Sequence, residues 1–151
     1  MKTNEYLEKK SAEWRTFEDA RAERTKERDA LKEAGDWDGV KAFDEKEKKD
    51  FPVPYTQGEC KAYRAYKQSR EKELDFLEAE DLPWDYEAED FINLLRKAGF
   101  TEMIITDQST DLMNLLFAFK DQGCRIGSLE IRQGKDWCGR DTEIKGIQMF
   151  I

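Results

Sequence analysis

The density of charged side chains changes near Leu82–Pro83, and this change most constrains the fold. Residues 1–82 hold 40 charged side chains, nearly half of that stretch, whereas residues 83–151 hold 20. Such a charged stretch offers only narrow apolar stripes, which is typical of surface helices. The sequence therefore predicts a charged helical part over residues 1–82 and a separate module over residues 83–151.

The charged part is expected to contain three helices. Heptad-spaced apolar residues predict a helix over residues 4–33, although the stripe is too thin for a strong coiled coil. Gly35 and Asp36 predict its end and the cap of a second helix over residues 37–50, which makes an antiparallel hairpin.

A third helix is predicted after the proline-containing connection of residues 51–55. Its start carries the capping-box pattern Thr56-Gln-Gly-Glu59, and apolar residues extend the helical pattern to Leu77. Its basic and aromatic side chains between Lys61 and Arg70 are one candidate surface for single-stranded nucleic acid, with packing of the tyrosines in the core as the alternative.

The module over residues 83–151 is expected to have the order α-β-α-β-β. Phase changes between the apolar residues of the fourth element predict a β-bulge near Gly127–Ser128. A three-stranded sheet with two helices on one face would bury these apolar residues, so the fold class is α+β. The expected strands are residues 103–106, 124–132 and 143–151.

The side-chain inventory excludes several kinds of chemistry. The chain has no histidine, and Cys60, Cys124 and Cys138 form no Cys-x-x-Cys pair. This excludes Ser-His-Asp and Cys-His catalysis and histidine-ligated metals, and it argues against a thiolate zinc site. No apolar run could span a bilayer and no secretory signal is present, so we expect a cytoplasmic, non-enzymatic protein without cofactor or metal.

Nine carboxylates lie between Glu73 and Leu95 without one lysine or arginine among them. The chain has a net charge of -8, so this acidic strip leaves the rest of the chain near +1. One interpretation is a solvated linker. The other is a surface that imitates the phosphate backbone and binds a basic protein. The candidate partner-binding residues are Glu78, Glu80, Asp81, Asp85, Glu87, Glu89 and Asp90.

Trp137 is the candidate outside the strip. It lies in the polar loop between the last two predicted strands. Its indole either inserts into a pocket of a partner or folds back on the sheet.

Two stretches of the last 60 residues, Asp107-Gln-Ser-Thr-Asp-Leu-Met113 and Gly123-Cys-Arg-Ile-Gly-Ser-Leu-Glu130, resemble a known group of proteins. They look like small uncharacterised accessory proteins of plasmids and conjugative elements in Gram-positive gut bacteria. The resemblance implies a mobile genetic element as context, in which some accessory proteins inhibit defence systems. The leading hypothesis is an acidic inhibitor, of anti-restriction or anti-CRISPR type, of a nucleic-acid-processing enzyme.

Three alternatives stay open. A nucleic-acid-binding accessory factor would use the basic residues of the third helix and the row Arg21, Arg24 and Arg28. A carboxylate-metal enzyme would use oxygen ligands from the strip, although the EF-hand pattern is missing. A homodimer is also open, because Trp14 and Phe17 can pack within the chain or across a two-fold interface.

Overall fold

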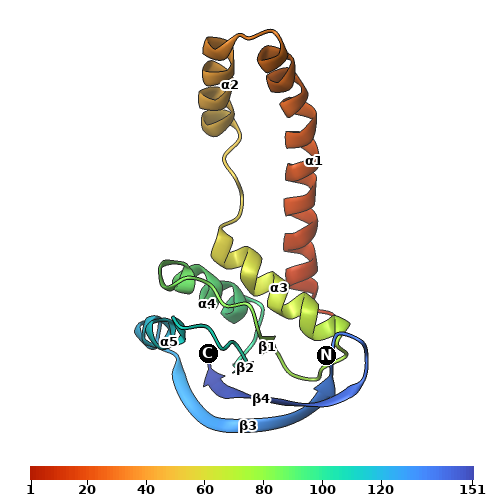
Figure 1. Cartoon of the computed structure of the whole chain (residues 1–151), viewed down its shortest axis with the longest axis vertical. Helices are drawn as coiled ribbons and strands as arrows, with labels where there is room; N and C mark the ends of the chain where they lie inside the picture. The colour runs from red at the N-terminus through yellow and green to blue at the C-terminus, as the bar shows by residue number, and fades with distance from the viewer. The chain divides into compact units, whose positions relative to one another are not determined.

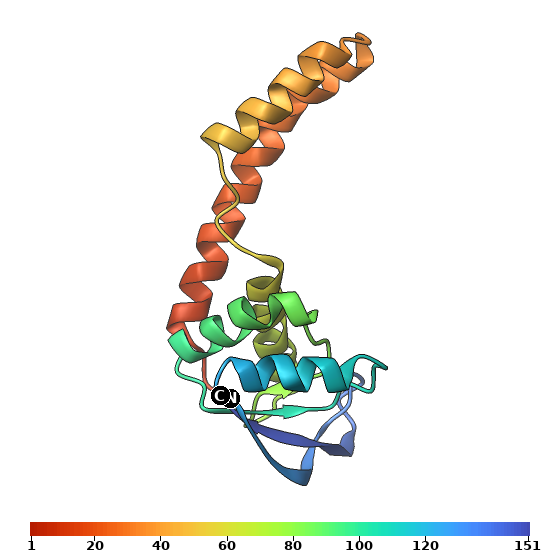
Figure 2. The same cartoon turned by 90° about the vertical axis from the view of Figure 1, so that its left-hand side faces the viewer.

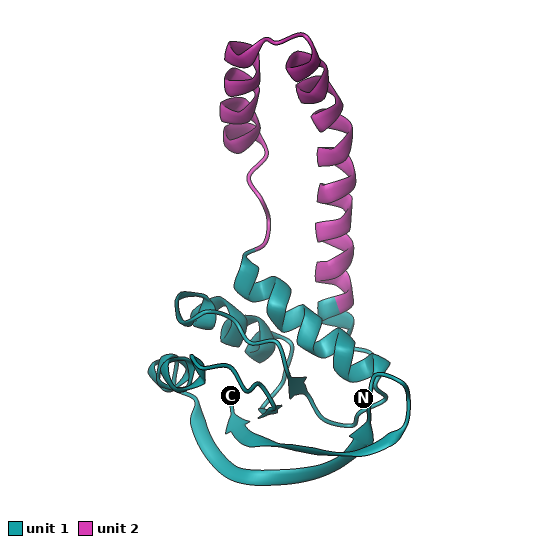
Figure 3. Cartoon of the chain, viewed as in Figure 1, with its two compact units in different colours: residues 1–7, 56–151 teal, residues 8–55 magenta.

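A computed structural model describes residues 1–151, which form two compact units (Figure 3). Unit 1 comprises residues 1–7 and 56–151, and unit 2 comprises residues 8–55. The fold is mixed α+β. The compositional boundary at Leu82–Pro83 lies inside unit 1, because helix α3 (Gln57–Glu71) packs against helix α4 (Ala88–Lys97). Charge density therefore does not mark the division between the compact units.

Unit 2 is a helical hairpin, as the sequence predicts. Helices α1 (Glu5–Glu33) and α2 (Trp37–Asp50) run antiparallel side by side (Figures 1 and 2). Gly35 adopts φ 71°, the left-handed conformation that ends a helix, and the Asp36 carboxylate accepts a hydrogen bond from the Gly39 N–H at 2.9 Å. Both local signals are confirmed.

Ion pairs join the two helices of the hairpin. Arg24 lies 2.7 Å from Glu47, and Arg28 lies 2.6 Å from Asp44. The Arg24 guanidinium also lies 3.8 Å from the centroid of the Phe51 ring. These arginine side chains therefore join the two helices of the hairpin, whose apolar stripe is thin.

Aromatic contacts also join α1 to the segment that follows α2. The Trp14 and Phe17 rings lie 5.4 and 6.4 Å from the Tyr55 ring, centroid to centroid. The Tyr55 hydroxyl donates a hydrogen bond to Glu18. Trp14 and Phe17 therefore pack within the chain, which is the first of the two alternatives for these side chains.

Helix α3 begins as predicted and ends earlier than predicted. Thr56 and Glu59 form the reciprocal capping box, with bonds of 3.2 and 2.9 Å. The helix ends at Glu71 instead of continuing to Leu77, because Glu73 takes φ 56°. The N–H of Leu74 then bonds the Ser69 carbonyl at 2.9 Å, which is the Schellman closure.

The sheet has four strands, not the predicted three. Their order is β1-β2-β4-β3, in which β1 and β2 are parallel and the other pairs are antiparallel. Strand β1 escaped prediction because it has two residues, one of them a glutamate, and shows no alternation. The strands are β1 (Glu78–Ala79), β2 (Glu102–Ile105), β3 (Arg125–Lys135) and β4 (Asp141–Phe150).

The sheet buries apolar side chains on both faces. Leu74 and Phe76 form a cluster with Ile104 and Ile144 on one face. Met103 and Met149 point to the opposite face and are also buried. Helices α4 and α5 (Leu112–Asp121) lie on one side of the sheet (Figure 2). The expectation of a core on one face was therefore incomplete.

The C-terminal module contains a β-bulge. The register of β3 against β4 shifts between Ile126 and Leu129, which confirms the predicted bulge. No helix has both the length and the apolar character that a membrane crossing requires.

Candidate functional site

The seven candidate residues of the acidic strip lie in four different segments of the chain. Glu78 lies in β1, and Glu80 and Asp81 lie in the loop that follows. Asp85 and Glu87 form the ends of a single 3₁₀ turn, η1 (Asp85–Glu87). The last two carboxylates, Glu89 and Asp90, belong to the first turn of α4.

Glu78 is buried and serves the fold. Its carboxylate lies 2.8 Å from the Lys72 ammonium and accepts a hydrogen bond from the Thr106 hydroxyl at 3.2 Å. Burial alone would lower the pKa of Lys72, but hydrogen bonds to Glu78 and Glu80 outweigh it, so this pKa is raised above its ordinary value. A carboxylate held in this way cannot belong to an exposed binding surface.

Glu87 is also buried and paired. The Lys61 ammonium lies 3.4 Å from its carboxylate, which accepts a hydrogen bond from the Trp84 N–H at 2.9 Å. Glu87 thus fixes the start of η1 and the backbone of Trp84. Like Glu78, it is a structural residue.

The other five candidates are at least partly exposed, and two of them are paired. Glu80 lies 2.8 Å from Lys72, and Asp81 lies 2.6 Å from Arg64. Asp85, Glu89 and Asp90 form no ion pair and lie in or just before the first turn of α4. Negative charge there interacts favourably with the helix dipole.

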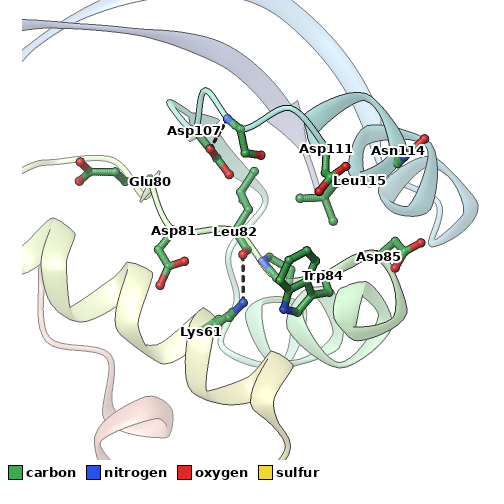
Figure 4. A pocket seen from close by; sticks show the side chains of 12 residues that line it. Lys61, Glu80, Asp81, Leu82, Trp84, Asp85, Asp107, Asp111, Asn114 and Leu115 are labelled. Atoms are coloured by element: carbon green, nitrogen blue, oxygen red, sulfur yellow. Dashed lines mark hydrogen bonds between the residues drawn. The ribbon is translucent and has the colours of Figure 1, made fainter.

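A hollow of about 510 Å³ collects part of the strip together with residues from elsewhere in the sequence (Figure 4). We call it the acidic pocket. It lies beyond the carboxyl ends of the parallel strands β1 and β2, which is where open sheets with parallel strands commonly bind ligands. Its lining residues are Lys61, Glu80, Asp81, Leu82, Pro83, Trp84, Asp85, Asp107, Ser109, Asp111, Asn114 and Leu115.

The topology of the sheet explains why these side chains meet. Asp81 follows β1 and Asp107 follows β2, and parallel strands end at the same edge of a sheet. Asp111 immediately precedes α5 and makes no capping hydrogen bond with its side chain. Asp107 accepts a hydrogen bond from the Ser109 N–H at 2.7 Å, which orders the loop between β2 and α5.

The acidic pocket is strongly negative. Five carboxylates and one ammonium line it, which gives a net charge of -4 for the lining. The ammonium, Lys61, is held at the edge by Glu87 and by the Leu82 carbonyl, 3.3 Å away. Asp85, Asp107 and Asp111, which also line the hollow, form no ion pair.

Trp84 supplies an aromatic surface among these charges. Its side chain is 55% exposed and lies between Lys61 and the start of α5 (Figure 4). The Lys61 ammonium lies 5.8 Å from the Trp84 ring centroid. A carboxylate-lined hollow with an accessible indole is suited to a cation that can also stack.

Trp137 is not part of the acidic pocket. Its side chain is 88% exposed at the turn between β3 and β4, so it does not fold back on the sheet. It borders a second hollow of about 690 Å³, which Lys72, Glu80 and Lys135 also line. This hollow mixes both signs of charge.

The basic residues proposed for nucleic-acid binding are largely paired inside the chain. Arg24 and Arg28 bind Glu47 and Asp44, and Arg64 binds Asp81. The neighbouring pairs, Arg21 with Glu18, Lys61 with Glu87 and Lys67 with Glu71, lie within 3.7 Å. These contacts reduce the positive charge that either basic surface could offer a phosphate backbone.

The metal alternative has no geometric support. The chain contains no group of three or more cysteine and carboxylate side chains placed to hold a metal ion. The three cysteines are all free thiols.

The family model for a domain of unknown function, DUF7698, matches residues 61–151. The chain belongs to the DUF7698 family. The DUF7698 match begins at Lys61 and includes every residue that lines the acidic pocket, whereas residues 8–55 of unit 2 lie outside it. No curated protein and no solved structure matches the chain.

Asp107, Asp111 and Trp84 line the pocket but were not predicted from the sequence as site residues. The position of Asp107 directly after a predicted strand was the one available signal. Its proximity to Asp81 depends on β1, which the sequence did not reveal.

Proposed function

We propose that this chain is a non-catalytic protein-binding module whose acidic pocket accepts a cationic side chain, preferably arginine, from a basic protein partner. The observation that carries the proposal is that Asp85, Asp107 and Asp111, none of them in an ion pair, line the same hollow as the accessible Trp84 side chain. The acidic pocket thus offers both negative charge and an aromatic ring on which a cation can stack.

Arginine fits this arrangement better than lysine does. A guanidinium is planar, stacks on an indole and binds carboxylates through two parallel N–H···O bonds. An ammonium is a compact and strongly hydrated charge that loses more on leaving water. Trp84 and the carboxylates of the pocket offer both kinds of contact that a guanidinium can use.

The partner class we favour is a nucleic-acid-processing enzyme with a basic substrate channel. Such a channel is built to attract closely spaced negative charge, and a lining of net charge -4 offers such a concentration. In this proposal the chain is an accessory protein of a mobile element that inhibits the enzyme by occupying its basic surface. Glu89 and Asp90, in the first turn of α4, would extend the contact beyond the pocket.

A peptide-binding experiment tests the pocket directly. The probe is a fluorescently labelled hexa-arginine peptide, compared with hexa-lysine, and the readout is fluorescence anisotropy. We expect tighter binding of the arginine peptide. Asp85→Asn, Asp107→Asn and Asp111→Asn together should weaken this binding by about tenfold or more, because two or more charged contacts are lost.

The matched control changes the net charge by the same amount outside the pocket. It combines Asp75→Asn, Asp121→Asn and Asp141→Asn, three exposed positions. We expect less than about a twofold effect, because long-range attraction alone is weak at physiological salt. Equal weakening by both variants, or equal affinity for both peptides, would show that the pocket is not a specific site.

A capture experiment then tests the partner class. The full chain and the pocket variant serve as baits for lysate of a bacterium that carries nucleic-acid-processing enzymes. Retention of such an enzyme by the unchanged chain alone, with loss of its activity on DNA or RNA, would support the inhibitor role. An enzyme that is retained but stays fully active would contradict it.

A further inference from the structure

Strand β3 is an unusually open edge of the sheet. It is the last strand in the order β1-β2-β4-β3, and it spans eleven residues from Arg125 to Lys135. Only β4 pairs with it, so the outer N–H and C=O groups of β3 have no partner strand. Long edges of this kind are where another strand adds most readily.

The side chains of this edge are apolar where exposure is greatest. Ile105, Ile147 and Leu129 stand in register across three adjacent strands, and exposure rises from 2% at Ile105 to 84% at Leu129. Ile131, two residues along β3 on the same face, is 62% exposed. The apolar row of the core therefore continues to the edge of the sheet and ends in water.

We propose that a second copy of this chain covers this edge, with the two β3 strands antiparallel about a two-fold axis at Ile131. The two sheets then join into one continuous sheet. Ile131 lies opposite Ile131 of the second copy, with Leu129 diagonal to it, so the four exposed side chains cover one another. The outer backbone groups of both strands gain hydrogen-bond partners.

Charge complementarity favours this occupant and this register. A two-fold at Ile131 places Glu130 opposite Arg132 of the second copy and Arg132 opposite Glu130 of the second copy. Within one chain these two side chains share the other face of β3, 3.8 Å apart at their closest charged atoms. The strand thus carries its own complementary charge pattern, which gives two opposite-charge pairs across the axis.

Neighbouring registers lack this complementarity. A two-fold at Glu130 places two glutamates opposite each other, and a two-fold at Arg132 places two arginines opposite each other. Like charges directly opposite in a sheet destabilise the pairing. The bulge between Ile126 and Leu129 disfavours registers centred closer to Arg125, because the ladder there is irregular.

Charge complementation is the first test, and its readout is mass by sedimentation equilibrium of the full chain. We expect the unchanged chain to reach twice its mass of 17.8 kDa. Glu130→Arg alone and Arg132→Glu alone each place like charges opposite in both pairs, so dimerisation should weaken by about tenfold or more. An equimolar mixture of the two variants restores both opposite-charge pairs and should dimerise.

Three results overturn the proposal. One is a chain that stays monomeric at its highest soluble concentration. Another is single variants that dimerise as well as the unchanged chain, and a third is folded variants whose mixture stays monomeric. Circular dichroism checks the fold of each variant, because Arg132 also lies 3.6 Å from Glu102 within the chain.

Disulfide trapping tests the register without charge changes. Ile131→Cys in a Cys138→Ser background places two thiols opposite each other across the axis, at a Cα separation that a disulfide accepts. The matched control is Gln133→Cys in the same background, whose two copies would stand four residues apart, about 13 Å. We expect a covalent dimer from Ile131→Cys only. Equal cross-linking of both, or of neither, would overturn the register.

Discussion

The Lys72 ammonium lies 2.8 Å from the Glu78 carboxylate, whose side chain is 8% exposed. This pair holds β1 in the sheet, because Glu78 is one of only two residues in that strand. The hydroxyl of Ser69 contacts the same strand by accepting a hydrogen bond from the Glu78 N–H at 2.9 Å. The end of α3 and the first strand are therefore joined by polar contacts.

Replacing Lys72 by methionine should destabilise the protein by about 2 kcal/mol, because it leaves the buried Glu78 carboxylate without its cation. Urea denaturation followed by circular dichroism measures this change in the free energy of unfolding. The control is Lys67→Met, which removes a lysine from an exposed pair with Glu71. That change should stay below about 0.5 kcal/mol. Equal effects would show that the Lys72 pair does not hold β1.

The hairpin of unit 2 should lose stability in acid. The hydrogen bond from Arg24 lowers the pKa of Glu47 below its ordinary 4.5, and the bond from Arg28 lowers the pKa of Asp44 below its ordinary 3.8. A carboxyl group whose pKa is lowered by folding stabilises the folded state at pH values above its ordinary pKa. This contribution to stability is lost as the pH falls through the lowered pKa.

Thermal denaturation by circular dichroism at 222 nm, repeated at decreasing pH below 4.5, measures this loss. The control variant carries Arg24→Gln and Arg28→Gln, and its melting temperature should fall less steeply over the same range. A variant as acid-sensitive as the unchanged chain would show that other carboxylates cause the loss.

Gly58 should not tolerate a side chain. A Cβ there would lie 2.5 Å from the Glu87 carbonyl oxygen, a backbone atom that cannot move without shifting η1. Gly58→Ala should therefore destabilise the protein by about 1–3 kcal/mol and disturb the acidic pocket through Trp84. Urea denaturation measures the first effect. Gln57→Ala, at the exposed neighbouring position, is the control, and an equal effect there would contradict the close-approach explanation.

The three cysteines should react with iodoacetamide at different rates. Cys138 is exposed, Cys60 is half-buried and Cys124 is buried. Burial raises the pKa of the Cys124 thiol, and the nearby Arg96 opposes this only in part. Peptide mass spectrometry after timed alkylation should show Cys138 modified first and Cys124 last. Early modification of Cys124 under native conditions would contradict its burial.

The sequence determined the features that depend on neighbouring residues. The end of α1 at Gly35, the capping box at Thr56 and Glu59, and the bulge between Ile126 and Leu129 were all predicted correctly. Each is a local backbone preference or a change in side-chain period, so a few adjacent residues suffice to encode it.

Only the tertiary structure decided how the acidic residues are used. The nine carboxylates of the strip become two buried structural ones, Glu78 and Glu87, three exposed ones that pair with basic residues, and four that form no ion pair. Asp107 and Asp111, far along the chain, join Asp85 at the acidic pocket. Those relationships depend on the parallel pairing of a two-residue strand, whose polar sequence carries no periodic signal.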